Sequence, residues 1–174
     1  MQRVGRRRSF IALVAAVLLI ATSGSAALAT TTRYTIVSHA TVPAVVTDPG
    51  TMKEHGSVVS VRGEKNSQTQ VSSSAYGAYV AGPETNVFNY DVDWVNGSGF
   101  WWGKGTHRPT AHQGGSWECS WHGRMANWTW TGQGVCHGTG ELKGWQWRSD
   151  LSMDVNNILH TQGYIFFAGD RSPD

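Results

Sequence analysis

Apolar and polar residues alternate with a period of two along several segments of this chain, a pattern typical of strands with one buried face. The clearest segment is Thr85–Val95. Its apolar positions are Phe88, Tyr90, Val92 and Trp94, and its polar positions are Asn89, Asp91 and Asp93. The turn Asn96–Gly99 follows, and Asn-Gly favours the positive φ of a tight hairpin. We therefore expect Phe100–Arg108 to return as the partner strand.

Strand segments separated by turns are expected along the whole chain from Tyr34 to Phe167. No long apolar segment has helical spacing, and turn signals such as Asp48–Gly50 recur at short intervals. The pattern predicts an all-β fold: a single antiparallel β-barrel of about eight strands, in which successive strands mostly pair. The other expected strand segments are Tyr34–Val46, Val58–Arg62, Thr69–Val80, Ser116–His122, Trp128–Cys136, Trp145–Met153 and Ile158–Phe167.

The first 29 residues have the features of a cleavable signal peptide. A basic start is followed by an apolar run from Phe10 to Ala21, which is too short to span a bilayer. Ala27-Leu28-Ala29 then fits a peptidase site. We expect a signal peptide over 1–29 and one barrel domain over 30–174, in a secreted or extracytoplasmic protein. Arg7-Arg8-Ser9-Phe10-Ile11 resembles a twin-arginine export signal, and an ordinary secretion signal is the alternative.

Cleavage changes the charge of the protein. The whole chain has a formal net charge of +2, but four of its arginines lie in the signal peptide. Ten basic residues then face twelve acidic ones, and no basic run remains. We therefore expect no nucleic-acid partner, and no membrane association after cleavage. The histidines lack metal-ligand spacing, and there is no phosphate loop, so neither a metal nor a cofactor is expected.

The two cysteines support the predicted strand layout. Cys119 and Cys136 lie in an exported chain, where disulfides form and persist. They fall on two expected strands joined by the short loop Met125–Asn127. Pairing them places Trp121 opposite Gly134, and Gly123 opposite Gly132, which is a sensible cross-strand arrangement. Gly132 and Gly134 also indicate a kink or bulge in the second of these strands.

A glycine-rich phrase carries a resemblance to a known superfamily. The segment Gly134–Gly144 reads GVCHGTGELKG, and it is similar to the turn of allene-oxide-cyclase-type barrels, a calycin-like group that includes the dirigent proteins. Gly115-Ser116-Trp117-Glu118 and Trp121-His122-Gly123 resemble the preceding strand of those barrels. The resemblance covers about Gly99–Phe167 and implies a fold more than an activity. His137 stands where a small residue is common, and no catalytic group can be transferred residue by residue.

All nine tryptophans lie between Trp94 and Trp147. Core packing is one explanation, and an aromatic ligand site is the other, because indoles offer large rigid surfaces and one N–H donor. Trp101 and Trp102 are adjacent on one strand, so they point to opposite faces. The candidate ligand-binding residues are Tyr90, Trp94, Trp101, Trp102, Trp121 and Trp147.

Four charged residues form an alternative polar site if the polar faces point inward: Asp91, Asp93, Arg148 and Asp150. Because unpaired buried charges are costly, we expect these four to be mostly exposed. The residues expected to be mostly buried are Phe88, Tyr90, Trp94, Trp117, Trp121, Trp145 and Trp147.

Three functions fit these observations. The first is a binding barrel for a small apolar or aromatic ligand in a tryptophan-lined lumen. The second is a cyclase or isomerase of the allene-oxide-cyclase or dirigent type, which would need convergent polar groups in the lumen. The third is an extracellular structural or interaction protein with a filled barrel. The sequence leaves the choice of ligand, an enzymatic role and the oligomeric state open.

Overall fold

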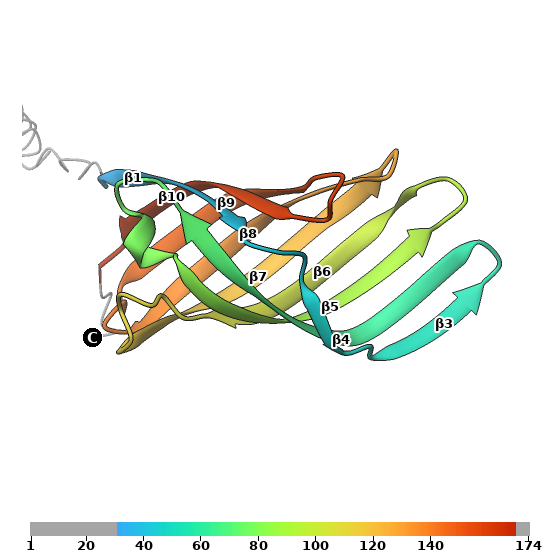
Figure 1. Ribbon diagram of the computed structural model, residues 1–174, viewed down its shortest axis with the longest axis horizontal. Helices are drawn as coiled ribbons and strands as arrows, with labels where there is room; N and C mark the ends of the chain where they lie inside the picture. Colours follow the sequence, from blue (N-terminus) through green and yellow to red (C-terminus); the bar gives the residue numbers. More distant parts are fainter. Residues whose placement is uncertain (1–30, 170–174) are drawn as a thin grey trace, which may run out of the picture. The chain divides into compact units, whose positions relative to one another are not determined.

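The computed structural model describes residues 31–169, so the predicted signal peptide lies outside the described part. Ten strands and one short 3₁₀ helix follow one another in this part (Figure 1). No helix within residues 31–169 is long and apolar enough to cross a membrane. The elements are β1 (Arg33–Ala40), β2 (Val45–Asp48), β3 (Thr51–His55), β4 (Val58–Ser72), η1 (Gly77–Tyr79), β5 (Gly82–Asp93), β6 (Ser98–His107), β7 (Gly115–Ala126), β8 (Thr129–Gly140), β9 (Trp145–Met153) and β10 (Leu159–Phe167).

All the strand pairs are antiparallel and belong to one sheet. The hydrogen-bonded order is β1-β10-β9-β8-β7-β6-β5-β4-β2, and β3 pairs with β4 off this path. From β4 to β10 each strand lies beside its neighbour in sequence, as predicted for a meander. Strand β1 pairs with β10, and its last three residues also pair with β4, with Ser38 opposite Ser72. The all-β antiparallel prediction is confirmed.

Several predicted strand boundaries in the N-terminal half were wrong. The segment Tyr34–Val46 is two strands, β3 was not predicted, and β4 runs without a break through residues 63–68. The expected strand Thr69–Val80 ends at Ser72, and η1 follows. The reason is the burial of the chain after β4: Val80 is fully buried, and the Tyr79 carbonyl accepts a 2.7 Å hydrogen bond from the Trp117 indole.

The predicted register between β7 and β8 is confirmed. Cys119 lies opposite Cys136, Trp121 opposite Gly134, and Gly123 opposite Gly132. The connection is a two-residue turn, in which Asn127 and Trp128 have φ of 50° and 62°. This positive φ at both positions is what a tight hairpin needs. A kink or bulge was predicted at Gly132 and Gly134, and the bulge was wrong, because pairing with β7 and β9 continues there without a shift.

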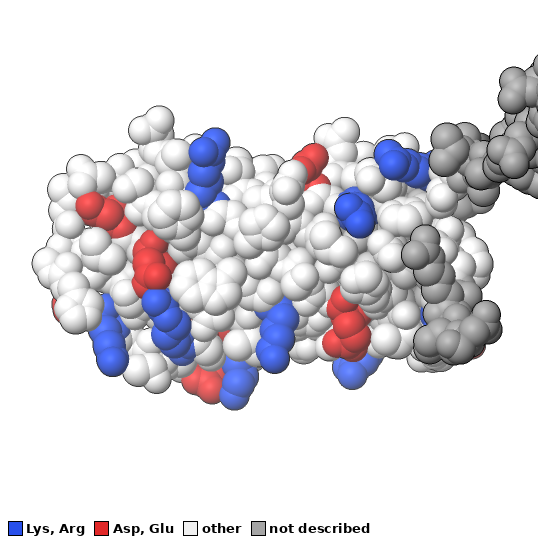
Figure 2. All heavy atoms as spheres, turned by 180° about the vertical axis from the view of Figure 1, so that it is seen from behind, with Lys and Arg blue, Asp and Glu red and all other residues white. Residues whose placement is uncertain are grey.

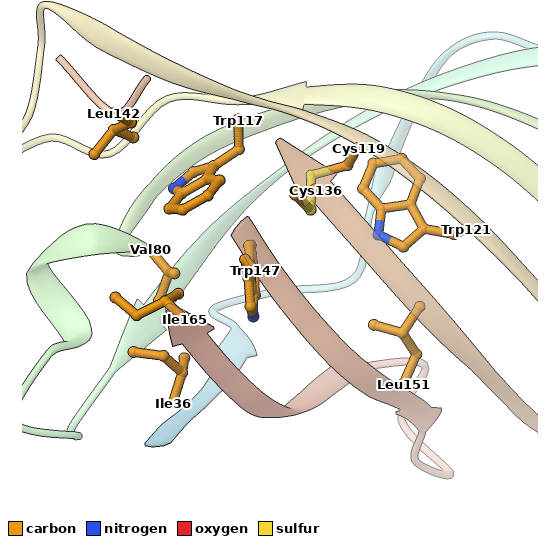
Figure 3. Packing of buried hydrophobic residues seen from close by; sticks show 10 residues of the cluster. All are labelled: Ile36, Val80, Trp117, Cys119, Trp121, Cys136, Leu142, Trp147, Leu151 and Ile165. Carbon is orange, nitrogen blue, oxygen red and sulfur yellow. A yellow bond between two sulfur atoms is a disulfide. The ribbon is translucent and has the colours of Figure 1, made fainter. Parts of the chain in front are cut away.

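The disulfide expected from the sequence is present in the core. The Sγ atoms of Cys119 and Cys136 are 2.02 Å apart, and the loop between them spans 17 residues. For a loop of this length the chain-entropy model gives a stabilisation of about 3 kcal/mol. Figure 3 shows the disulfide on β7 and β8 among buried side chains, with Trp117 and Trp121 from the same face of β7. The bridge therefore joins β7, which carries two buried indoles, to β8.

Large rings on the buried face of the sheet lie over glycines of neighbouring strands. A Cβ atom at Gly134 would lie 2.7 Å from Cδ1 of Trp121. The rings of Trp101 and Phe88 likewise occupy the space that side chains at Gly132 and Gly103 would fill. Glycine in a strand costs backbone entropy, and here it is the residue that lets a rigid ring approach the backbone.

The glycine-rich phrase forms the tight turn between β8 and β9. Gly140 and Gly144 have φ of 57° and 87°, in the left-handed region that favours glycine. Between them Leu142 is 1 % exposed and belongs to the core cluster. The turn therefore packs Leu142 against the core.

A register shift in β4 decides which of its side chains are buried. Val61 lies opposite Tyr90 and Glu64 lies opposite Phe88, so Arg62 and Gly63 form a bulge. Gly63 has φ of 73°. Because side chains alternate along a strand, the extra residue moves Glu64, and every second residue after it, onto the buried face. Lys65 instead faces outward, where it pairs with Asp48.

Replacing Gly134 with alanine tests the packing of indoles over glycine. The new methyl group meets the ring of Trp121, so we expect a loss of about 1–3 kcal/mol in the free energy of unfolding. Urea denaturation measures it, with Thr131→Ala on the exposed face of β8 as a control that changes stability by about 0.5 kcal/mol or less. In a double-mutant cycle, Trp121→Ala should remove most of the cost of Gly134→Ala. Strictly additive effects would contradict this account.

Candidate functional site

A cavity of about 420 Å³ opens on the buried face of the sheet. Its volume lies in the range usual for small-molecule sites. Most of its wall comes from β4 to β9, and further lining residues come from the connections after β1 and β9. The residues that line it are Pro43, Ala44, Val46, Glu64, Asn66, Gln68, Glu84, Phe88, Tyr90, Trp94, Trp101, Trp121, Trp130, Leu151, Ser152, Met153, Asn157 and Leu159.

One side of the cavity is an aromatic wall made of six residues: Phe88, Tyr90, Trp94, Trp101, Trp121 and Trp130. Phe88 contacts Trp101 and Trp121, with ring centroids 5.7 and 5.8 Å away. The Trp101 indole donates a 3.2 Å hydrogen bond to the carbonyl of Thr131, which fixes its ring across β8. Phe88, Trp101 and Trp121 are therefore held in place by contacts within the protein.

Next to it lies a polar wall from β4 and β5, made of Glu64, Asn66, Gln68 and Glu84. Their side chains bond to one another or to close neighbours. The Asn86 amide donates to Asn66 at 3.1 Å, and Gln68 donates to Glu84 at 3.1 Å. This wall was not predicted. It exists because the bulge at Gly63 turns the polar residues of β4 toward the buried face.

Glu84 is the most deeply placed charged group of the cavity, with only 5 % of its surface exposed. Its Oε2 accepts hydrogen bonds from the amides of Gln68 and Gln70, at 3.1 and 3.2 Å. Nδ1 of the fully buried His107 lies 3.7 Å from the same oxygen, beyond hydrogen-bond length. Burial raises the pKa of Glu84, but the neighbouring imidazole and the two amides outweigh burial, and the net shift of the pKa is downward. The carboxylate is therefore ionised at neutral pH.

Glu64 and Tyr90 join the polar wall to the aromatic wall. The Tyr90 hydroxyl donates a 3.1 Å hydrogen bond to Oε2 of Glu64. Burial raises the pKa of Tyr90 to about 12, and the adjacent negative charge and hydrogen bond of Glu64 act in the same direction. Tyr90 thus remains a neutral phenol whose ring faces the cavity.

Four of the six candidate ligand-binding residues line the cavity: Tyr90, Trp94, Trp101 and Trp121. Trp102 does not, since it lies on the opposite face of β6, with the guanidinium of Arg62 4.8 Å from its ring centroid. Trp147 is buried in the core cluster against His107 and Trp117. Phe88, although predicted to be buried, was not among the candidates, and Trp130 was missed.

Most of the predicted buried positions follow the alternation. Trp117, Trp121 and Trp147 are buried, and Phe88, Tyr90 and Trp145 are half-buried. The prediction that Trp94 is mostly buried was wrong, because 43 % of its surface is exposed. It lies just beyond the end of β5, where its ring meets that of Trp128 at 5.8 Å rather than entering the core.

The four residues of the alternative polar site lie on the outer face, away from the cavity lining. Arg148 and Asp150 are exposed, and Asp91 and Asp93 are half-buried. Asp91 forms a bidentate ion pair with Arg62, at 2.8 and 2.9 Å. Figure 2 shows acidic side chains lying next to basic ones on one face of the molecule. Residues 31–169 contain no group of three or more His, Cys, Asp or Glu residues placed to hold a metal ion.

Comparisons with known proteins do not assign the chain to a family. No family model matches the chain, and no curated protein matches it either. Among solved structures, it is similar to the crystal structure of a protein with unknown function from the DUF3224 family of Shewanella oneidensis MR-1. The TM-score is 0.49 and the identity 13 %, over 78 % of this chain and 97 % of that chain.

The shifted pKa of Tyr90 is directly measurable. Spectrophotometric titration should show one phenol ionising near pH 12, and its signal should disappear in Tyr90→Phe. In Glu64→Gln the carboxylate charge is gone, so the phenolate is no longer repelled and the midpoint should fall. Circular dichroism at each pH checks that the protein is still folded. An unchanged midpoint in Glu64→Gln would show that Glu64 does not set the pKa.

Proposed function

We propose that the chain is an exported binding protein that holds a small apolar or aromatic ligand in this cavity. The observation that carries the proposal is the set of six aromatic rings that line a cavity of about 420 Å³, with a few polar groups beside them. Small-molecule sites commonly combine mostly apolar walls with a few fixed polar groups that orient the ligand. A filled interior, as in a structural protein, would leave no such space.

The proposal includes a closed β-barrel as the scaffold. Its support is the pairing of β1 with both β10 and β4, which returns the hydrogen-bonded order to its start. Closure removes the edges of a sheet, and about eight strands leave an interior just wide enough for one small ligand. We also propose that the fold is related to the allene-oxide-cyclase and dirigent barrels. This relation is supported by the tight turn at Gly140 and Gly144 with the buried Leu142 between them.

Binding is favoured over a cyclase or isomerase by the positions of the charged groups. The residues expected to serve such an enzyme, Asp91, Asp93, Arg148 and Asp150, lie outside the cavity lining. Glu84 lies inside, but its lowered pKa makes it a weak base at neutral pH. Export is supported by the signal-peptide pattern of residues 1–29 and by the disulfide, since disulfides persist in oxidising compartments.

Ligand extraction tests the proposed function. The protein is purified from the exported fraction without denaturant, then denatured, and released small molecules are identified by mass spectrometry. We expect a stoichiometric compound from the wild type and a strong loss of it in Ala44→Trp, in which an indole enters the cavity. Val45→Trp adds the same indole at a neighbouring exposed position that does not line the cavity, so it should retain the compound. Equal yields from both variants, or none from the wild type, would contradict the proposal.

A further inference from the structure

The cavity is lined by two carboxylates and by no cationic side chain. The ionisable residues that line it are Glu64, Glu84 and Tyr90, and the lining includes no lysine, arginine or histidine. Tyr90 is a neutral phenol at physiological pH, so the two carboxylates determine the charge of the cavity. A ligand that enters it meets two carboxylates, next to six aromatic rings.

The two carboxylates are fixed by neutral groups. Glu84 is held by the amides of Gln68 and Gln70, and Glu64 by the phenol of Tyr90. These donors orient the carboxylates but do not neutralise them. The buried imidazole of His107 approaches only Glu84, at 3.7 Å. A buried carboxylate in low-dielectric surroundings gains strongly from a cation brought next to it, and loses further when an anion is brought there.

The aromatic wall has the same charge preference. The face of an aromatic ring carries the negative end of its quadrupole, and tryptophan attracts cations most strongly. Trp101 and Trp121 lie on β6 and β7, on either side of the Phe88 ring, and the lining also contains the apolar side chains of Leu151, Met153 and Leu159. Carboxylates and indole faces around one space are the groups that bind ammonium ions. The aliphatic side chains suit the uncharged body of such a ligand.

We infer that the ligand is an organic cation: a primary amine or quaternary ammonium compound with an apolar or aromatic body. The ammonium group lies by the carboxylate of Glu84, and the body packs against Trp101 and Trp121. This inference rests on the proposed function and specifies its ligand class. A neutral aromatic alcohol and an anion represent the competing ligand classes, and the inference excludes both.

Three probes with one body separate the classes by charge. Calorimetry at pH 7 compares 2-phenylethylamine with the neutral 2-phenylethanol and the anionic phenylacetate. We expect the amine to bind at least tenfold more tightly than the alcohol, and phenylacetate to bind more weakly than either. The trimethylammonium derivative of the amine should also bind more tightly than the alcohol, because cation–π attraction does not need an N–H donor.

Substitutions test whether the preference for the amine comes from the carboxylate of Glu84. Glu84→Gln should lower the affinity for the amine at least tenfold while the affinity for the alcohol stays within threefold. Glu118→Gln is the matched control, since Glu118 is exposed on the outer face of β7 and bonds to Thr106. If Glu84→Gln does not fold by circular dichroism, Glu64→Gln replaces it, with an expected loss of at least threefold for the amine alone.

The results that overturn the inference leave the proposed function separately testable. Equal or tighter binding of the alcohol or of phenylacetate would show that charge does not select the ligand, while a small-molecule site would still stand. The same holds if Glu84→Gln and Glu118→Gln bind the amine equally well. If none of the probes binds, the inference is overturned, and ligand extraction, which does not depend on charge, decides whether the binding function fails with it.

Discussion

The packing of rigid aromatic rings over glycine backbones is the constraint on which the rest of this structure depends. Trp121 occupies the space above Gly134, and Trp101 occupies the space above Gly132. A side chain at either glycine, or at Gly123 of β7, would clash with one of these rings. The glycines thus allow β6, β7 and β8 to hold large rings on one face, and the disulfide between Cys119 and Cys136 joins the strands beside them.

The bulge in β4 places the polar wall of the site. If β4 ran regularly through Arg62 and Gly63, without the bulge, Lys65 would share the buried face with Val61, and the cavity would contain a lysine. With the bulge, Glu64, Asn66 and Gln68 face the rings, and Lys65 is outside with Asp48. One backbone irregularity therefore sets the sign of the charge opposite the aromatic wall. Arg62, at the bulge, is held outside by its ion pair with Asp91.

The sequence predicted the parts of the fold in which apolar and polar residues alternate. The strands from β5 to β10 and the β7–β8 register were predicted because aromatic residues, cysteines and glycines mark one face of each. The polar wall was not predicted, because residues 64–70 of β4 are polar on both faces and periodicity is then uninformative. A glycine after a β-branched run, as at Gly63, is the signal that could have indicated the bulge.

The candidate site was predicted in part for the same reason. Tyr90, Trp94, Trp101 and Trp121 lie on marked faces, and they line the cavity. Trp147 shares the buried face with them, but its depth in the core depends on long-range packing against His107 and Trp117. Glu84 lies on the same face of β5 as Phe88 and Tyr90. In the sequence, a glutamate at this position interrupts the apolar pattern of the face. Its hydrogen-bond partners Gln68 and Gln70 lie on another strand, β4.

The central claim is that an ionised Glu84 and a tryptophan wall form one binding site for a cation. A crystal structure of the exported protein with 2-phenylethylamine tests it most directly. We expect the ammonium nitrogen to lie within about 2.7–3.2 Å of a Glu84 carboxylate oxygen, and the phenyl ring to pack against Trp101 and Trp121. Density for the amine only on the outer face, or a cavity filled by the protein's own side chains, would contradict the account.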